Sequence, residues 1–255
     1  RTFTVDNNVN LWSQKQAAHP QAKTPARERQ EPAHLAADLL ASGSIEFSNG
    51  KPEEIEAVAQ LLPRGMTVLV PVLHGKTLSS RLMLMEGLHA AGFDVVPHLA
   101  ARRIASRDEL RGFLDGARRM GALRRVLIIG GDAEQAAGPY ADASAVLESG
   151  LLQDYDVSEV GFAGYPEGHP LVPAEELRRA LLAKLETAAR LGLGYHVITQ
   201  FSFVPARILE YCAWLATAAA GTPVYAGLAG PASLRQLVHF ARYCGVAASL
   251  SAITK

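Results

Sequence analysis

Short apolar runs alternate with helical patterns along most of this chain, and that alternation restricts the fold more than any other feature. Met66–Leu73 is a continuous apolar run, typical of a strand buried on both faces, and the helical pattern after it ends at Gly92. Successive apolar runs lie about thirty residues apart, which is the spacing of βαβ units. The predicted strands are Ser44–Phe47, Met66–Leu73, Asp94–Leu99, Arg125–Ile129, Val157–Ala163, Tyr195–Phe203 and Pro223–Ala226. The predicted helices are His34–Leu40, Lys51–Leu62, Leu78–Ala91, Arg107–Met120, Asp142–Leu152, Ala174–Leu191, Ala206–Ala219 and Leu234–Tyr243.

These strand–helix units predict an α/β fold, a (β/α)8 TIM-type barrel whose last unit is missing, disordered or shortened in this chain. Residues 247–255 can only begin an eighth unit. The competing fold is an open doubly wound sheet, but no Gly-x-Gly-x-x-Gly follows the first predicted strand. We expect residues 34–255 to form one catalytic barrel domain. Residues 1–33 are polar and irregular, and we expect them to be an extension.

Composition excludes several classes of function. Lys and Arg number 25 and balance 25 Asp and Glu, so the chain has no bulk attraction for nucleic acid or an anionic membrane. No apolar run reaches transmembrane length and no signal-peptide pattern opens the chain, so the expected location is cytoplasmic. Cys212 and Cys244 are isolated, and we expect reduced, buried residues. No H-x-H or HExxH spacing occurs, and we expect no metal.

Polar residues follow the predicted strands, where barrel enzymes collect their chemistry. They are Glu46, His74, His98, Asp132, Tyr165, Glu167, His169 and Gln200. Strand alternation would direct Glu46 into the lumen, where a raised pKa would suit a general acid; the alternative is a solvated edge residue.

Each of the other strand-end residues also has a functional and a structural interpretation. Asp132 follows a Gly-Gly pair that allows close backbone approach to a ligand, and it can equally be a helix N-cap or turn residue. His98 is either a ligand contact or a core histidine. Gln200 must pair with a ligand or with a neighbouring strand end. Phe203 either stacks on an aromatic ring or belongs to the core.

Four stretches in this order resemble the methylenetetrahydrofolate reductase family, over roughly residues 36–246. They are SIEF (44–47), PHL (97–99), VLIIGGD (126–132), and AGYPEGHP (163–170) together with ITQF (198–201). The resemblance implies a (β/α)8 barrel that binds FAD at the carboxyl ends of its strands. It also implies reduction of 5,10-methylenetetrahydrofolate to 5-methyltetrahydrofolate, with NAD(P)H reducing the flavin first.

Residue roles follow from the resemblance alone. Glu46 would be the general acid that protonates the folate nitrogen. Asp132 would hold the pterin near the flavin, and Gln200 would hydrogen-bond the pterin, with Phe203 as a further substrate contact. The FAD site would be lined by His98, Gly131, Asp132, Ala163, Tyr165, His169 and a basic residue late in the fifth helix, Lys184 or Arg190.

Several positions depart from the family pattern, mostly on the flavin side. Ser48-Asn49-Gly50 replaces a double proline, and VPVLHG (70–75) replaces a Thr-Tyr-Gly-Ala-like strand end. Gly130 stands where members often carry an arginine that faces the flavin phosphates, and Leu234 stands where an aromatic is often found.

Because these departures affect the flavin side and the second strand while the folate-side residues persist, and because the eighth unit is not visible, three alternatives stay open. The first is a flavin-independent enzyme in which NADH passes hydride directly to the folate, with its dinucleotide site rebuilt around Val70–Lys76. The second is a non-redox folate-binding partner subunit with a degenerate barrel site. The third is an enzyme that runs the reaction in reverse. The family often forms oligomers, so the resemblance also suggests a homo-oligomer.

Overall fold

The computed structural model describes residues 43–48, 50–73, 75, 77–230 and 233–246. Seven parallel strands form one sheet, and each strand pairs with the next in sequence order. The strands are β1 (Ser44–Glu46), β2 (Thr67–Val70), β3 (Asp94–Ala100), β4 (Arg125–Ile129), β5 (Glu159–Gly164), β6 (Gly194–Thr199) and β7 (Val224–Tyr225). The helices are α2 (Pro52–Leu61), α3 (Leu78–Ala90), α4 (Arg107–Arg119), α5 (Ala143–Leu147), α6 (Leu151–Asp154), α7 (Ala174–Arg190), α8 (Pro205–Ala218) and α9 (Leu234–Tyr243), with a 3-10 turn η1 (Ala101–Arg103) after β3.

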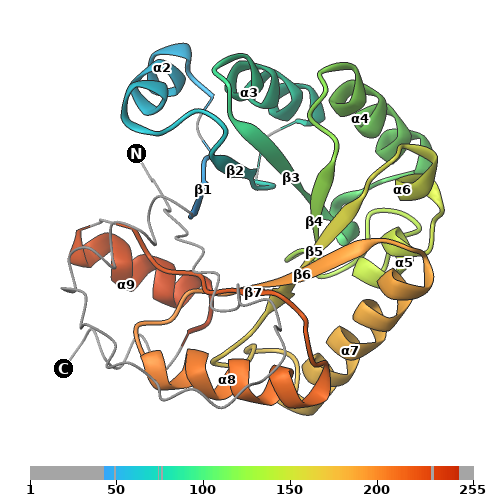
Figure 1. Ribbon diagram of the computed structural model, residues 1–255, viewed down its shortest axis with the longest axis vertical. Coiled ribbons are helices and arrows are strands. Elements are labelled where there is room, and N and C mark those ends of the chain that lie inside the picture. Colours follow the sequence, from blue (N-terminus) through green and yellow to red (C-terminus); the bar gives the residue numbers. More distant parts are fainter. Residues whose placement is uncertain (1–42, 49, 74, 76, 231–232, 247–255) are drawn as a thin grey trace, which may run out of the picture.

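The sheet curls, and its helices lie on the convex outer side (Figure 1). This is the predicted TIM-type arrangement with one unit missing: within the described residues β1 and β7 are the two edges of the sheet. Four sequence features lie outside the described residues: the extension 1–33, the predicted helix 34–40, His74, and the stretch 247–255 proposed as the start of an eighth unit.

Most predicted boundaries lie within one or two residues of those in the structure, and three predictions differ by more. The predicted helix over residues 142–152 is two short helices, because Gly150 adopts a left-handed φ of +77° between α5 and α6. The strand β2 ends at Val70, since Pro71 has no N–H to donate to the sheet. The strand β6 ends at Thr199 rather than Phe203, so Gln200 and the residues after it form a loop.

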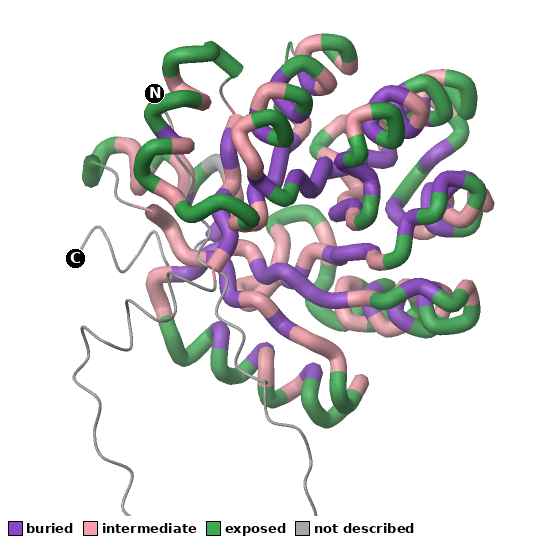
Figure 2. The backbone as a smooth tube through the Cα atoms, turned by 45° about the horizontal axis from the view of Figure 1, so that its top comes forward, coloured by how far each residue is buried: buried purple, intermediate pink, exposed green. Residues whose placement is uncertain are grey.

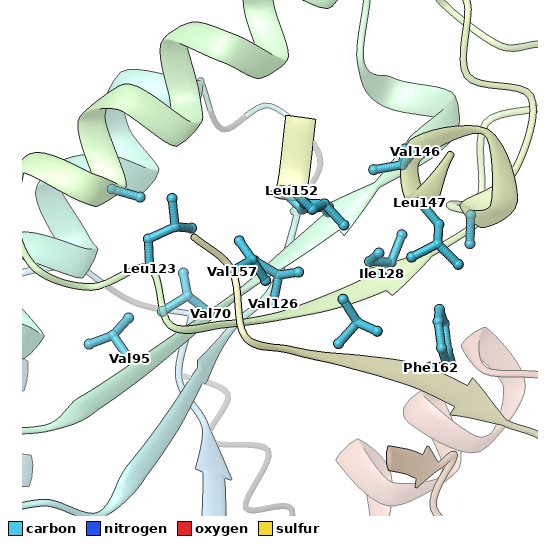
Figure 3. Close-up of a cluster of buried hydrophobic side chains, with 14 of the residues drawn as sticks. Val70, Val95, Leu123, Val126, Ile128, Val146, Leu147, Leu152, Val157 and Phe162 are labelled. Carbon is cyan, nitrogen blue, oxygen red and sulfur yellow. The ribbon is translucent and has the colours of Figure 1, made fainter. Parts of the chain in front are cut away.

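Most of the core lies between the sheet and its outer helices. Buried residues run along the strands while the helices expose their outer faces (Figure 2). Figure 3 shows Ile128 of β4 and Phe162 of β5 beside Val146 and Leu147 of α5. All four side chains are fully buried, because each comes from the face of its strand or helix that turns toward the other layer.

A smaller core fills the inner side of the sheet. Leu69, Val96, Leu127 and Ile198 form this inner cluster, with Ile129 and Tyr225 packed against it. Gly161 leaves room for it: a Cβ at that position would lie 2.7 Å from Nε2 of His196 and 2.8 Å from Cδ1 of Leu127. The interior is therefore packed with side chains, as in other barrels of this type.

Polar side chains occupy the inner face at the amino ends of the strands. Arg125 forms an ion pair with Asp94 and donates a hydrogen bond of 2.9 Å to the hydroxyl of Thr67. Next to them, Nδ1 of His196 lies 2.5 Å from a carboxylate oxygen of Glu159. The first group joins β2, β3 and β4, and the second joins β5 and β6, at the floor of the sheet. We therefore expect a ligand to approach from the opposite, carboxyl end.

Two further sequence expectations concern cysteines and membranes. Cys212 and Cys244 form no disulfide, as predicted, but they are half-buried rather than fully buried. Among the residues that the structure describes, no helix combines the length and the apolar character needed to cross a bilayer.

Candidate active site at the carboxyl ends of the strands

Glu46 is the last residue of β1 and lies on the inner side of the sheet. It is in register with Leu69 of the inner cluster, whereas its neighbours Ile45 and Phe47 belong to the outer core. Alternation along the strand produces this arrangement, because successive side chains point to opposite faces. The carboxyl group is thus at the mouth of the sheet and half-buried.

The Gly130-Gly131-Asp132 turn follows β4. Gly131 adopts a left-handed φ of +88°, and a Cβ there would lie 3.3 Å from the Cβ of Ala100 at the end of β3. Asp132 accepts from the guanidinium of Arg103, with Nη2 at 2.7 Å and Nε at 2.8 Å from its Oδ1. Asp132 is not a helix N-cap, since Asp142 caps the next helix. A guanidinium therefore stands beside the turn, but it comes from η1 rather than from position 130.

The loop after β5 carries an aromatic pair. The rings of Tyr165 and His169 meet edge to face with centroids 5.5 Å apart. Burial raises the pKa of the Tyr165 hydroxyl and lowers the pKa of the His169 imidazole, so burial favours the neutral form of both. Glu167 between them accepts a hydrogen bond of 2.6 Å from the Ser202 hydroxyl, which ties this loop to the loop after β6.

Gln200 follows β6 directly. Its backbone N–H donates to the carbonyl of Gly164 at 2.7 Å, and its Oε1 accepts from the N–H of Phe201 at 3.0 Å. The side-chain NH2 has no acceptor within the described part of the chain. Ala163 lies on the inner face in register with Ile198. Phe203 contacts Phe201, with ring centroids 5.6 Å apart, and joins the small apolar cluster that includes α9 residues.

His98 is a buried polar residue on the inner face of β3. It is 7% exposed, and its Nε2 has no hydrogen-bond partner among the described residues. Burial, and then the nearby charge of Arg81, lower the pKa of His98 to about 3, so the imidazole is neutral at physiological pH. A neutral imidazole with an orphaned nitrogen is suited to a ligand hydrogen bond.

The basic residues expected late in the fifth helix lie on the outer layer. The amino group of Lys184 is 5.6 Å from the centre of the Phe162 ring, which faces the helices, and burial lowers the pKa of the Lys184 amine. Arg190 pairs with Glu148 at 3.9 Å, and Leu234 begins α9 as an exposed residue.

Two arginines near the site were not singled out from the sequence. Arg103 belongs to an Arg-Arg pair one turn beyond the end of β3, and Arg81 interrupts the apolar side of α3. The Arg-Arg pair after the predicted strand was a usable signal for Arg103. Only the packing of α3 against β3 identifies Arg81. Within the described ranges no group of three or more His, Cys, Asp or Glu side chains is arranged to hold a metal ion.

Comparison with known proteins gives a family match and a likeness to solved structures. A family model described as methylenetetrahydrofolate reductase matches residues 52–252, so the match covers β2 to β7 and begins after Glu46. The chain is also similar to a crystal structure of D-psicose 3-epimerase in the presence of D-fructose, with 15% identity and a TM-score of 0.34. That likeness covers 60% of this chain and 59% of the epimerase chain, less than two thirds of either, and contributes nothing to the assignment. On the family match, the chain belongs to the methylenetetrahydrofolate reductase family.

Proposed function

We propose that this protein transfers hydride between NAD(P)H and 5,10-methylenetetrahydrofolate, with 5-methyltetrahydrofolate as the reduced product, in either direction. Membership of the family supports a folate-related oxidoreductase function. The observation that carries the finer proposal is the common location of three polar residues. Glu46, Asp132 and Gln200 all lie at the carboxyl ends of parallel strands of one curled sheet, where barrel enzymes bind substrate.

Glu46 is the proposed general acid. Opening of the methylene bridge leaves an iminium on one folate nitrogen and needs a proton on the other. Hydride addition to the iminium carbon then gives the methyl group, so one proton and one hydride enter the product. A half-buried carboxyl side chain on the inner face, at the mouth of the sheet, is placed to deliver that proton to a bound substrate.

Gln200 and Asp132 are the proposed pterin contacts. The amide of Gln200 offers a free NH2 donor, and its orientation is fixed by the backbone N–H of Phe201. The carboxylate of Asp132, which pairs with the Arg103 guanidinium, would accept hydrogen bonds from pterin N–H groups. Phe203 is a weaker candidate contact, because its ring already packs on Phe201.

The residues present fit a flavin at the same mouth. His98 supplies an orphaned buried nitrogen, and Gly131 supplies backbone without a Cβ. Ala163 and the Tyr165–His169 pair would line the ring or its ribityl chain. FAD, when bound, would carry hydride from NAD(P)H to the folate. The Lys184 amino group would have to move away from the Phe162 ring to contact a flavin at the mouth of the sheet.

The deciding experiment begins with the absorbance spectrum of the purified protein, followed by anaerobic titration with methylenetetrahydrofolate and either NADH or NADPH. Flavin absorbance with nucleotide oxidation supports the FAD route. A colourless protein that oxidises NADH only when folate is present supports direct transfer. Folate binding with no hydride transfer in either direction would refute the proposal and indicate a non-redox partner subunit.

A pair of variants tests the acid. Glu46→Gln keeps the shape of the side chain but removes its proton, and we expect turnover to fall about 100-fold or more. Glu186→Gln on the exposed side of α7 is the matched control and should leave turnover unchanged. Equal activity of the two variants would exclude Glu46 as the acid.

Three expectations about the whole protein accompany this proposal. Residues 34–255 would act as one catalytic domain, the protein would work in the cytoplasm, and it would assemble as a homo-oligomer. Light scattering of the purified protein measures the last of these directly.

A further inference from the structure

A cavity of about 460 Å³ lies outside the sheet, between α3 and α4, at the carboxyl ends of β2 and β3. Its volume falls within the range of small-molecule sites, about 300–1,000 Å³. Apolar side chains, among them Leu78, Leu99, Leu110 and Phe113, form much of its wall. The sites described above are on the inner side of the sheet, so this cavity is separate from the proposed folate position.

A buried arginine lines the cavity. Arg81 is 6% exposed, its Nη2 donates to the carbonyl of His98 at 2.5 Å, and its guanidinium lies 4.8 Å from the centre of the Phe113 ring. Its Nε is buried without a partner, and no carboxylate pairs with it among the described residues. Burial lowers the pKa of Arg81 to about 10, so the group is charged at neutral pH. A buried cation without a counter-charge is costly, and an anion in the cavity would remove that cost.

The surroundings of the cavity are also suited to an anion. Leu78 and Ser79 begin the 13-residue helix α3, and their N–H groups precede the first helical carbonyl acceptor. Arg103 adds a second guanidinium at the rim, shared with Asp132. The one acid of the wall is Glu109. Its Oε2 accepts a hydrogen bond of 2.5 Å from the N–H of Ala105, just before the start of α4.

We propose that this cavity binds the phosphate-bearing part of a nucleotide, with Arg81 and the amino end of α3 holding the phosphate and the apolar wall holding the attached ring. Assignment of the nucleotide as NAD(P)H or FAD rests on the proposed function, whereas the anion site does not.

The test uses ADP, adenosine and inorganic phosphate as calorimetric probes of the full chain. ADP should bind the native protein, and Arg81→Gln should weaken its affinity about tenfold or more, the loss expected for one charge-assisted hydrogen bond. Arg111→Gln, an exposed α4 arginine paired with Asp108, is the matched control and should bind ADP as the native protein does. No ADP binding, or equal affinity in the two variants, would overturn the proposal. Phosphate binding as tight as ADP binding would overturn its nucleotide part.

A second variant covers the case in which Arg81→Gln fails to fold. Ser79→Glu puts a negative charge at an exposed position in the first turn of α3, where a helix tolerates an acid well. The same charge would lie at the proposed phosphate position and repel the phosphate. This variant should retain the native unfolding midpoint and lose ADP binding, while adenosine affinity stays unchanged. Retained ADP affinity in this folded variant would overturn the site.

Cofactor assays identify the source of the phosphate. If NAD(P)H is the ligand, Arg81→Gln raises the KM for the nucleotide and leaves kcat near native. If FAD is the ligand, the variant instead binds less flavin, and the flavin fluorescence of the protein-bound fraction falls. ADP binding without any folate-dependent hydride transfer would support the anion site and refute the proposed function, so the two failures are distinguishable.

Discussion

Gly227→Ala should destabilise the protein strongly, because the loop after β7 lies against the end of β6 at this residue. A Cβ at position 227 would lie 2.3 Å from the carbonyl oxygen of Thr199, 3.1 Å from the N of Phe201 and 3.3 Å from the carbonyl carbon of Gln200. All three are backbone atoms, so no side-chain rotation relieves the contact. The N–H of Gly227 also donates to the Thr199 hydroxyl at 2.9 Å.

The size of the effect follows from that geometry. The chain must separate by about 1 Å to restore an ordinary contact, and overpacking of this kind costs about 1–3 kcal/mol. For a chain of this length each kcal/mol lowers Tm by about 2–4 °C. Because Gln200 belongs to the displaced segment, we also expect a higher KM for the proposed folate substrate.

Urea denaturation of the variant measures this cost directly as a change in the midpoint at constant m value. Gly112→Ala is the matched control: it lies on the exposed side of α4 with no atom within 4 Å of the added Cβ, and it should stabilise by about 0.5–1 kcal/mol. A Gly227→Ala midpoint equal to or above the native one would refute the packing argument.

Three shorter predictions follow from the core, the floor and the β4 turn. Phe162→Ala should cost about 3–5 kcal/mol in chemical denaturation, while the exposed Leu171→Ala should cost little. The His196 hydrogen bond lowers the pKa of Glu159, so its stabilisation is complete above an unfolded pKa of about 4.3 and is lost as the pH falls through the lower folded value. Glu159→Gln should therefore flatten the acid limb of a stability–pH curve, and an unchanged limb would contradict the pairing. Gly131→Ala should cost about 1–2 kcal/mol because its φ is +88°, with a midpoint equal to the native value as the contrary result.

The regular parts of the fold were predictable from local pattern. The boundaries of β4 and α9 agree with the sequence prediction residue for residue. The apolar run of β4 lies between Arg124 and Gly130, and α9 begins after Ser233 and ends just before Cys244-Gly245. The inward direction of Glu46 followed from alternation with Ile45 and Phe47. The break at Gly150 was missed, because an apolar helical pattern continues through it and one glycine does not by itself end a helix.

In the candidate site, too, one part was predictable from the sequence and another part was not. The strand-end residues, including Glu46, Asp132 and Gln200, were found from sequence because parallel strands bring their carboxyl ends together whatever the details of packing. Their partners were not. The Asp132–Arg103 pair joins two different strand ends, and Lys184 points to an outer aromatic ring.

The sequence by itself determined the order of strands and helices, the curled parallel sheet and the resemblance to one folate enzyme family, because periodicity and short motifs are local properties of a chain. Only the tertiary structure decided which charges meet. Arg81 is an ordinary helical residue until α3 packs on β3. It then lies buried against the His98 carbonyl and Phe113, and no carboxylate in the described part of the chain pairs with it. The energetic weight of a charge depends on burial and partners, and both are set by residues distant in the chain.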